Sequence, residues 1–377
     1  MPQGFNQHGD ILVRLPDGTD INTLWADYQT TIQQWNADRN KLVSFLTFAV
    51  TNPLENVPIV GQDANFEAAS EYGQPVGARP SVSENWLAYT FKWYDLAARF
   101  TWQFLADAPQ SQVDAVQNAA LEADSRLVVN QVLTTLFSNV NRSASMNHQP
   151  YNVYAFWNAD GNVPPKYKNY TFDGTHNHYL TTGTAALQPA DLEQIIDNLD
   201  HHGYSRTNGY NQVVLVSKAT LNQIRPFRSF AGANLSAPDA THGLYDFVPT
   251  ANAVQTLILP QNVNVVGATP PSTFNGMDVM GSYGPLLIIQ EDFIPDGYLA
   301  AFATGGPDSL GNPIGFRQHP QANLQGMRLV KGQTPDYPLI DSYYVRGFGT
   351  GVRHRGAAVL MQITVSGTYT PPASFVF

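Results

Sequence analysis

The sequence contains no cysteine, so it predicts neither a disulfide framework nor thiolate chemistry. Charged residues are also scarce, since Asp, Glu, Lys and Arg make up only 13% of the 377 residues. This is about half the usual share, and a soluble monomer normally carries more surface charge. The low value, with many Tyr, Phe, Gly and Pro residues, indicates that much of the surface is buried against other chains. A β-rich extracellular protein is the alternative interpretation at this stage.

Long apolar runs are missing as well. No stretch approaches 18 consecutive apolar residues, so we expect no membrane-spanning helix and no membrane partner. Residues 1–20 include Asp10, Arg14 and Asp17 and no long apolar run, so the sequence also predicts no signal peptide. The net charge of −10 argues against a surface specialised for binding nucleic acid.

Motifs for catalysis or cofactor binding are absent or incomplete. There is no G-x-S-x-G element, and the glycines Gly347, Gly349 and Gly351 are not followed by the Lys-Ser/Thr of a phosphate loop. The carboxylates Glu291 and Asp292 are adjacent and would point apart on a strand. The distant carboxylate pair of a glycosidase would not be visible in the sequence. We therefore expect a protein that is not an enzyme, with no catalytic residue and no cofactor.

Histidines give the one pattern that resembles half of a metal site. His176 and His178 form D-x-x-H-x-H with Asp173, and His201–His202 follow. Residues two apart share one face of a strand, so two such imidazoles could bind one ion. Gly174 favours a turn instead, and no H-E-x-x-H or comparable motif completes the site. The sequence therefore predicts no bound metal.

The longest regular pattern is a helix from about Asp107 to Ser138, with Asp107 as its N-cap. Apolar residues recur at spacings of three, four or seven: Val113, Val116, Ala120, Leu127, Val128, Val132 and Leu136. The stretch has no Gly, and its only Pro stands at the start, where a helix tolerates it. About thirty residues at 1.5 Å each make a helix of about 45 Å, which we expect to lie across a sheet.

Residues 62–94 have the alternating pattern of a long β-hairpin. The outward strand would cover residues 62–72, and Gly73, Pro75, Gly77 and Pro80 would form an open tip. The return strand places four large apolar residues on one face: Leu87, Tyr89, Phe91 and Trp93. An isolated two-stranded ribbon is marginally stable in water, so this hairpin needs a partner for its apolar side.

The rest of the chain predicts one more helix, a second compact unit and two late strands. The helix runs from Asp20 to about Val50, and the second unit begins with a helix at Pro189. Ser217 can cap a helix over residues 218–224. Strands are expected at Val213–Val216, Leu257–Leu259, Asn264–Val266, Leu286–Ile289 and Tyr298–Phe302. The late strands, Leu339–Val345 and Ala357–Val365, are joined by a Gly-rich basic turn and are expected to pack under the long helix.

In this order of elements the chain resembles the major capsid proteins of tailed bacteriophages, which have the Hong Kong 97-type fold. The resemblance rests on the hairpin with its Gly/Pro tip at 73–80, on RFTWQFLADAPQSQVDAVQNAALEADSRLVVNQVL at 99–133, and on FNGMDVMGSYGPLLIIQEDFIPDGYLAAFAT at 274–304. It implies an α+β fold with five parts. They are an N-terminal arm and helix at 1–50, an extended E-loop at 51–98, a P domain at 99–188 with a spine helix at about 107–138, an A domain at 189–304, and return strands of the P domain with a C-terminal tail at 305–377.

The resemblance also implies a structural function. Such subunits self-assemble as hexamers and pentamers of an icosahedral head that encloses double-stranded DNA, touched without sequence specificity. The implied partners are a separate scaffolding protein, a portal and decoration proteins, and the implied location is the virion, assembled in the host cytoplasm. Two alternatives stay open: an encapsulin-type nanocompartment shell, and a secreted β-rich carbohydrate-binding or hydrolytic protein.

Charges on the hairpin and on the late basic turn suggest a contact between subunits. Some family members join an E-loop Lys to a neighbour's Asn, but residues 62–85 contain no Lys, so we expect no such cross-link. In the family the E-loop lies over a neighbouring P domain. The hypothesis is that Glu67 and Glu71 face Arg353 or Arg355 of an adjacent chain, in exposed pairs worth about 0–1 kcal/mol each.

Overall fold

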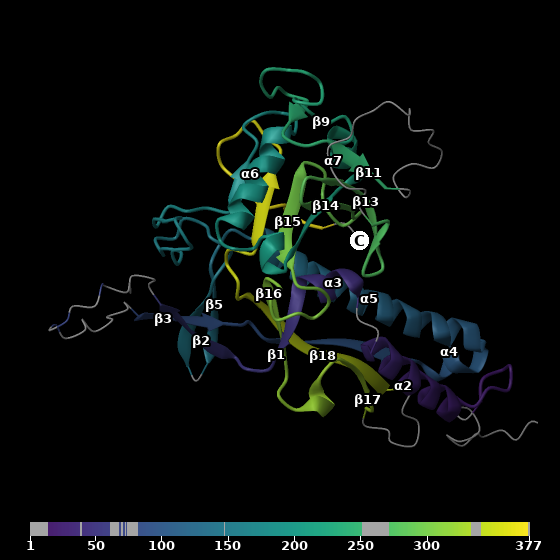
Figure 1. Cartoon of the computed structure of the whole chain (residues 1–377). Helices are drawn as coiled ribbons and strands as arrows, with labels where there is room; N and C mark the ends of the chain where they lie inside the picture. Colours follow the sequence, from purple (N-terminus) through teal and green to yellow (C-terminus); the bar gives the residue numbers. More distant parts are fainter. Residues whose placement is uncertain are drawn as a thin grey trace, which may run out of the picture.

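The computed structural model describes residues 14–37, 40–60, 68, 71, 73, 82–146, 148–250, 271–332 and 341–375. Two sheets dominate this part of the chain (Figure 1). A five-stranded sheet has the order β1-β16-β18-β17, with β4 also paired to β18. An eight-stranded sheet has the order β11-β13-β14-β8-β15-β19-β7, with β12 also paired to β13. None of the described helices has the length and apolar character needed to cross a membrane.

The long helix, α5, covers Gln110–Phe137 and has a short helix, α4 (Trp102–Asp107), before it. The expectation that Asp107 caps the long helix is wrong, because Asp107 is the last residue of α4. Thr101 caps α4 instead by accepting a hydrogen bond from the backbone N–H of Phe104. The extended backbone at Ala108 and Pro109 then separates the two helices.

The N-terminal region forms two helices and a strand, so the single helix expected from Asp20 to Val50 is wrong. Helix α2 covers Ile21–Ala37, α3 covers Lys41–Leu46, and β1 covers Thr47–Val50. Asn40 starts α3 by accepting hydrogen bonds from the backbone N–H groups at positions 42 and 43. Strand β1 pairs in parallel with β16 (Ile314–Gln318), and this long-range pairing overrides the helical pattern of the sequence.

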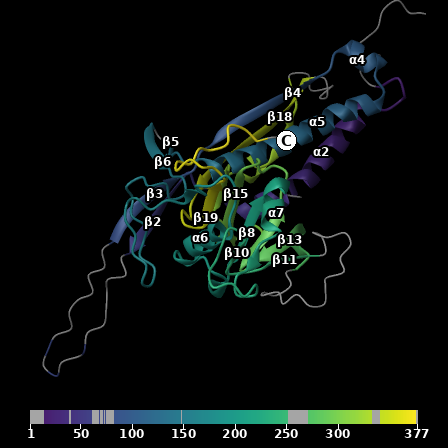
Figure 2. The same ribbon diagram turned by 90° about the horizontal axis from the view of Figure 1, so that it is seen from above.

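The hairpin is present, with its described strands at the base. Strand β2 (Leu54–Val60) pairs antiparallel with β3 (Val82–Ala88), and Figure 2 draws both reaching away from the two sheets. The expected outward strand at 62–72 lies almost entirely outside the described residues. The expected return strand is split, because β4 (Lys92–Arg99) leaves the hairpin and pairs with β18 (Asp341–Val352).

The glycines near the end of the chain lie in a strand, so the Gly-rich turn expected after position 346 is wrong. Strand β18 continues to Val352, and the chain after β3 crosses directly over it. A β-carbon on Gly349 would lie 1.7 Å from the carbonyl oxygen of Thr90, and one on Gly347 would lie 2.4 Å from the ring of Trp93. Glycine is needed at position 349 because two backbones approach closely, and at position 347 because a tryptophan ring lies against the strand.

The eight-stranded sheet contains most of the strands expected after position 189. Strands β8 (Asn211–Val216), β14 (Leu286–Gln290) and β15 (Tyr298–Thr304) are confirmed, as is α7 (Lys218–Ile224) with its Ser217 cap. Helix α6 begins at Pro189 as expected and ends at Asp200. The candidates Leu257–Leu259 and Asn264–Val266 lie outside the described residues.

The two late strands belong to different sheets, and both contact the long helix, as expected. Strand β18 is in the five-stranded sheet, whereas β19 (Ala358–Gln362) pairs with β15 and with β7 (Tyr179–Thr181). The smaller elements complete the described chain. They are β5 (Arg142–Met146), β6 (Gln149–Val153), η1 (Arg206–Asn208), β9 (Arg228–Ser229), β10 (His242–Gly243), β11 (Phe247–Pro249), β12 (Thr273–Phe274), β13 (Met277–Tyr283), η3 (Ala322–Leu324) and β17 (Met327–Val330).

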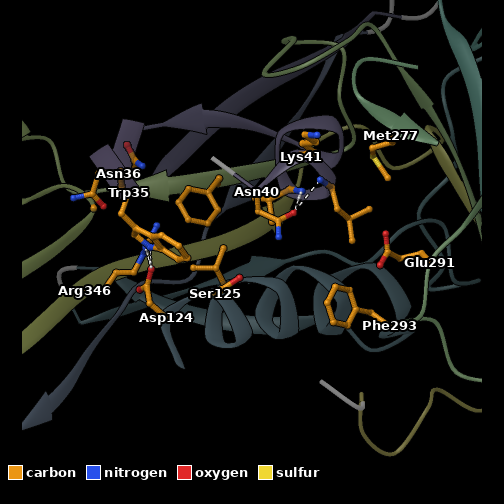
Figure 3. A pocket seen from close by; sticks show the side chains of 16 residues that line it. Trp35, Asn36, Asn40, Lys41, Asp124, Ser125, Met277, Glu291, Phe293 and Arg346 are labelled. Carbon is orange, nitrogen blue, oxygen red and sulfur yellow. Dashed lines mark hydrogen bonds and ion pairs between the residues drawn. The ribbon is translucent and has the colours of Figure 1, made fainter. Parts of the chain in front are cut away.

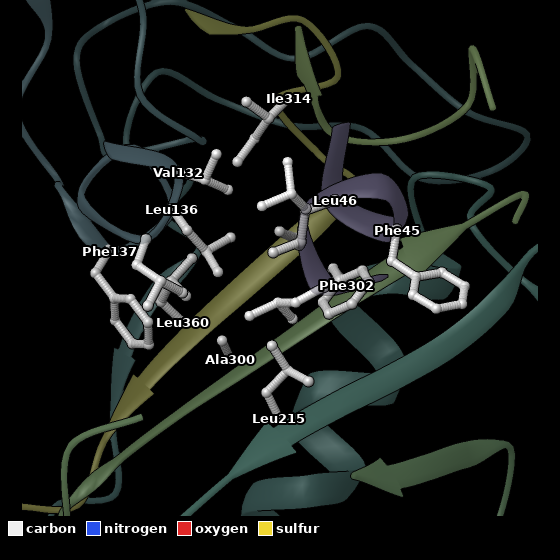
Figure 4. Packing of buried hydrophobic residues seen from close by; sticks show 14 of the residues in the cluster. Phe45, Leu46, Val132, Leu136, Phe137, Leu215, Ala300, Phe302, Ile314 and Leu360 are labelled. Carbon is white, nitrogen blue, oxygen red and sulfur yellow. The ribbon is translucent and has the colours of Figure 1, made fainter. Parts of the chain in front are cut away.

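One apolar core joins α5 to both sheets (Figure 4). Val132 and Leu136 of α5 lie beside Leu46 of α3 and Ile314 of β16, and the eight-stranded sheet contributes Leu360. Each of these five side chains is at most 1% exposed. Because the sheets share this core, the described chain cannot unfold one of them without exposing apolar surface of the other.

Candidate functional site

An ion pair fastens the base of the hairpin to the body of the subunit. Arg353, directly after β18, places its Nη2 atom 2.8 Å from Oε1 of Glu55 on β2. The hydroxyl of Tyr89 donates to the other oxygen of Glu55 at 2.9 Å. The arginine also lies over the ring of Phe48, with 5.5 Å to the ring centroid. Burial and the Glu55 carboxylate raise the pKa of Tyr89, which keeps its proton available for this hydrogen bond.

Arg355 lies inside the subunit, where its side chain is only 3% exposed. Its Nη2 atom is 2.8 Å from Asp160 Oδ2, and its Nε atom donates to the backbone carbonyl of Ala155 at 2.9 Å. The guanidinium stacks over Trp157, with 4.0 Å to the ring centroid. Arg355 therefore holds the segment around residue 158 against the turn between β18 and β19.

The described residues include three of the four candidate contact residues. Glu67 lies outside the described residues, and Glu71 is exposed. Arg353 keeps 28% of its side-chain surface exposed, whereas Arg355 keeps 3%. Arg353 is thus the arginine of this pair whose charge reaches the surface, and its pairing with Glu71 of an adjacent chain stays a prediction.

A second charged site, missed by the sequence analysis, joins α2, α5 and β18. Asp124 of α5 forms a short ion pair with Arg346 of β18, and the indole N–H of Trp35 donates to the same carboxylate oxygen at 3.0 Å. Figure 3 shows these three side chains grouped at one end of a cavity of about 460 Å³. Asp124 falls within the apolar stripe of the helix, and a charge at such a position is the signal that could have revealed the pair.

Large apolar side chains are exposed on the hairpin strand β3 and on the strands β4 and β18. Trp86 of β3, Trp93 and Leu96 of β4, and Tyr343 of β18 are between 39% and 47% exposed. Arg328 lies over the ring of Trp93, with 5.6 Å to the centroid. Exposed aromatic and arginine side chains of this kind are typical of surfaces that another protein covers.

Comparison with known proteins places the chain in a family. No family model and no curated protein matches the chain. The solved structures include a capsid structure of the cyanophage P-SCSP1u at 10% identity, covering 87% of this chain and 89% of that one, and an encapsulin complex from Synechococcus elongatus at 13% identity, covering 91% and 98%. Their TM-scores of 0.46 and 0.41 are too low to carry an inference.

A structure from Mycobacterium phage Patience is far more similar. It is 39% identical to this chain, with a TM-score of 0.76, and the match covers 98% of this chain and 97% of that chain. Identity at this level over nearly the full length of both chains confirms the resemblance that the order of elements indicated. The chain therefore belongs to the major capsid proteins of tailed bacteriophages.

Proposed function

We propose that the chain is the shell subunit of a phage head that encloses double-stranded DNA, assembled as hexamers and pentamers. The observation that carries this proposal is the 39% identity, over 98% of the chain, to the structure from Mycobacterium phage Patience. The exposed aromatic side chains beside the hairpin support it, because a shell subunit must bury surface on several sides. The low share of charged residues supports it for the same reason.

Within this proposal the parts of the Hong Kong 97-type fold map onto the described elements. The β2–β3 hairpin is the base of the E-loop, α5 is the spine of the P domain, and the eight-stranded sheet is the A domain. The A domain then also includes β7 and β19, which lie outside the 189–304 boundary drawn from the sequence.

The proposed partners follow from the same role. The subunit associates with copies of itself, and a separate scaffolding protein, a portal and decoration proteins complete the head. The net charge of −10 supports a container that touches its DNA without sequence specificity and does not adhere to it. The proposed location is the virion, with assembly in the host cytoplasm.

Electron microscopy of the purified protein tests this function. We expect uniform closed shells, and DNA inside shells isolated from infected cells. Shells filled with protein cargo instead of DNA would favour the encapsulin alternative. A monomer of 41.4 kDa at every concentration would contradict both shell functions and would favour the secreted alternative.

Reversing the charge at Glu71 tests the proposed contact between subunits. The Glu71→Lys subunit should fold with an unchanged thermal midpoint, because Glu71 is exposed. Its assembly should be weaker by about fivefold per contact, the factor that corresponds to an exposed pair of about 1 kcal/mol. Light scattering during assembly measures this change.

The matched control is Asp278→Lys, which makes the same change in net charge at an exposed position of β13. It should assemble like the original protein. Equal loss of assembly in both variants would mean that net charge, and not a contact of Glu71, controls assembly.

A further inference from the structure

Four histidines from two separate segments meet at one point of the fold. His176 and His178 precede β7, His201 is the C-cap of α6, and His202 follows it. One ligand atom of each residue lies within 4.8 Å of those of the other three. His178 is fully buried, and the other three are half-buried. The sequence analysis took the turn at Gly174 as a sign against a metal site. In the structure, the two histidines that follow this turn lie beside the end of α6.

The proton on His178 can be assigned from its surroundings. Its Nδ1 atom lies 2.7 Å from the carbonyl oxygen of Ala358, which can only accept a hydrogen bond. Nδ1 therefore carries the proton, and Nε2 of the neutral ring carries a lone pair. That lone pair points at Nε2 of His176, 3.0 Å away. The Nε2 atom of His202 approaches the same His176 nitrogen at 2.9 Å.

Hydrogen bonds among neutral rings cannot account for both contacts. A ring nitrogen has either one proton or one lone pair, so Nε2 of His176 can form only one full hydrogen bond with its two neighbours. The second contact then lacks a hydrogen bond of its own. In addition, Nε2 of His201 is buried with no hydrogen-bond partner among the described residues. Several nitrogen lone pairs thus converge without enough protons between them.

The geometry suits a metal ion with four nitrogen ligands. Zn²⁺ binds imidazole at about 2.0–2.1 Å in a tetrahedron, which places its nitrogens about 3.3–3.4 Å apart. The two short contacts lie a few tenths of an ångström below that value, and the other ligand-atom separations are at most 4.8 Å, so rotation of the rings has to bring all four nitrogens to one distance from an ion. The hydrogen bond from His178 to Ala358 is the kind of outer contact that orients a metal-binding histidine.

The surroundings favour a cation and pack one of its proposed ligands closely. The cluster lies at the C-terminal end of α6, where the helix dipole attracts positive charge. Phe172 stacks on His202, with 4.5 Å between ring centroids, and covers the ring from outside. On the inner side, a β-carbon at Gly356 would lie 2.8 Å from the His202 ring, so glycine is needed for the ring to fit.

We propose that His176, His178, His201 and His202 form a structural site for a divalent transition metal, with Zn²⁺ as the expected ion. Four protein ligands close the coordination sphere, as in structural zinc sites. The ion fastens the segment before β7 to the end of α6 and, through Ala358, to β19. Its role is to hold these three segments together in each subunit.

Metal analysis of the full-length protein tests the site. After expression with added zinc and exchange into metal-free buffer, we expect about one zinc ion per subunit, measured by inductively coupled plasma mass spectrometry. His176→Ala and His202→Ala should each reduce this content at least tenfold. The control His148→Asn changes an exposed histidine in a turn, where asparagine tolerates the positive φ of 63°, and should keep the zinc.

A measurement on the unaltered protein guards against variants that fail to fold. After chelation, titration with Co²⁺ should give the intense visible absorption of a tetrahedral nitrogen site, saturating at about one ion per subunit. The proposal is overturned if the unaltered protein retains no zinc and gives no such absorption. It is also overturned if folded His176→Ala and His202→Ala subunits retain as much zinc as the control.

Discussion

The Val132→Asp subunit is expected not to fold, and therefore not to form shells. Val132 is 1% exposed, in the core that joins α5 to both sheets (Figure 4). An aspartate there would bury a carboxylate without a partner and remove apolar contacts, at a cost of about 5 kcal/mol or more. Because the whole stability of a folded chain is about 5–15 kcal/mol, little would remain. Circular dichroism should find no cooperative thermal transition.

The control is Val116→Asp on the same helix. Val116 is 37% exposed, so an aspartate there keeps contact with water and should change the free energy of unfolding by less than about 1 kcal/mol. A normal thermal midpoint for Val132→Asp would contradict the packing of α5 described above. Similar losses in both variants would point to a general intolerance of charge on this helix.

The Asp124→Ala subunit is expected to be less stable by about 3–5 kcal/mol. Removing the Asp124 carboxylate would break its ion pair with Arg346, whose side chain is only 15% exposed. Trp35 would lose the acceptor for its indole N–H as well. Denaturant unfolding of the unassembled subunit measures this as a lower midpoint with an unchanged slope.

Glu122→Ala, two residues away, is the matched control for this ion pair. Glu122 and Arg126 are 3.8 Å apart with side chains 73% and 52% exposed, so the loss should be about 0.3–0.5 kcal/mol. The double variant Asp124→Leu with Arg346→Met should recover much of the stability, because no buried charge is left unpaired. Equal effects of Asp124→Ala and Glu122→Ala would show that the buried pair has no special role.

Elements with a strong local pattern were predictable from the sequence. The buried strands β8, β14 and β15 appear as short continuous apolar runs, which is typical of strands covered on both faces. Helix α5 follows from its periodicity, and α7 from the Ser217 cap. The family followed from the order of these elements, and the comparison with the phage structure confirmed it.

Features that depend on distant residues were not predictable. The apolar residues of 42–48 fit a continuous helix, and only the pairing of β1 with β16 makes the last of them a strand. Strand β19 has the apolar pattern of a buried strand, but that pattern does not identify β15 and β7 as its neighbours. The four histidines are separated by α6, so their spacing in the sequence gave no sign that they meet.

The five-stranded sheet pairs strands from the two ends of the chain, so its partners are synthesised at different times. Strands β1 and β4 end by residue 99, whereas their partners β16 and β18 begin at residues 314 and 341. A ribosome adding about 5–20 residues per second therefore synthesises the first strands about 10–50 s before their partners. A chain that terminates before β18 has no partner strand for β4. The five-stranded sheet can therefore form only after synthesis has passed Val352, the last residue of β18.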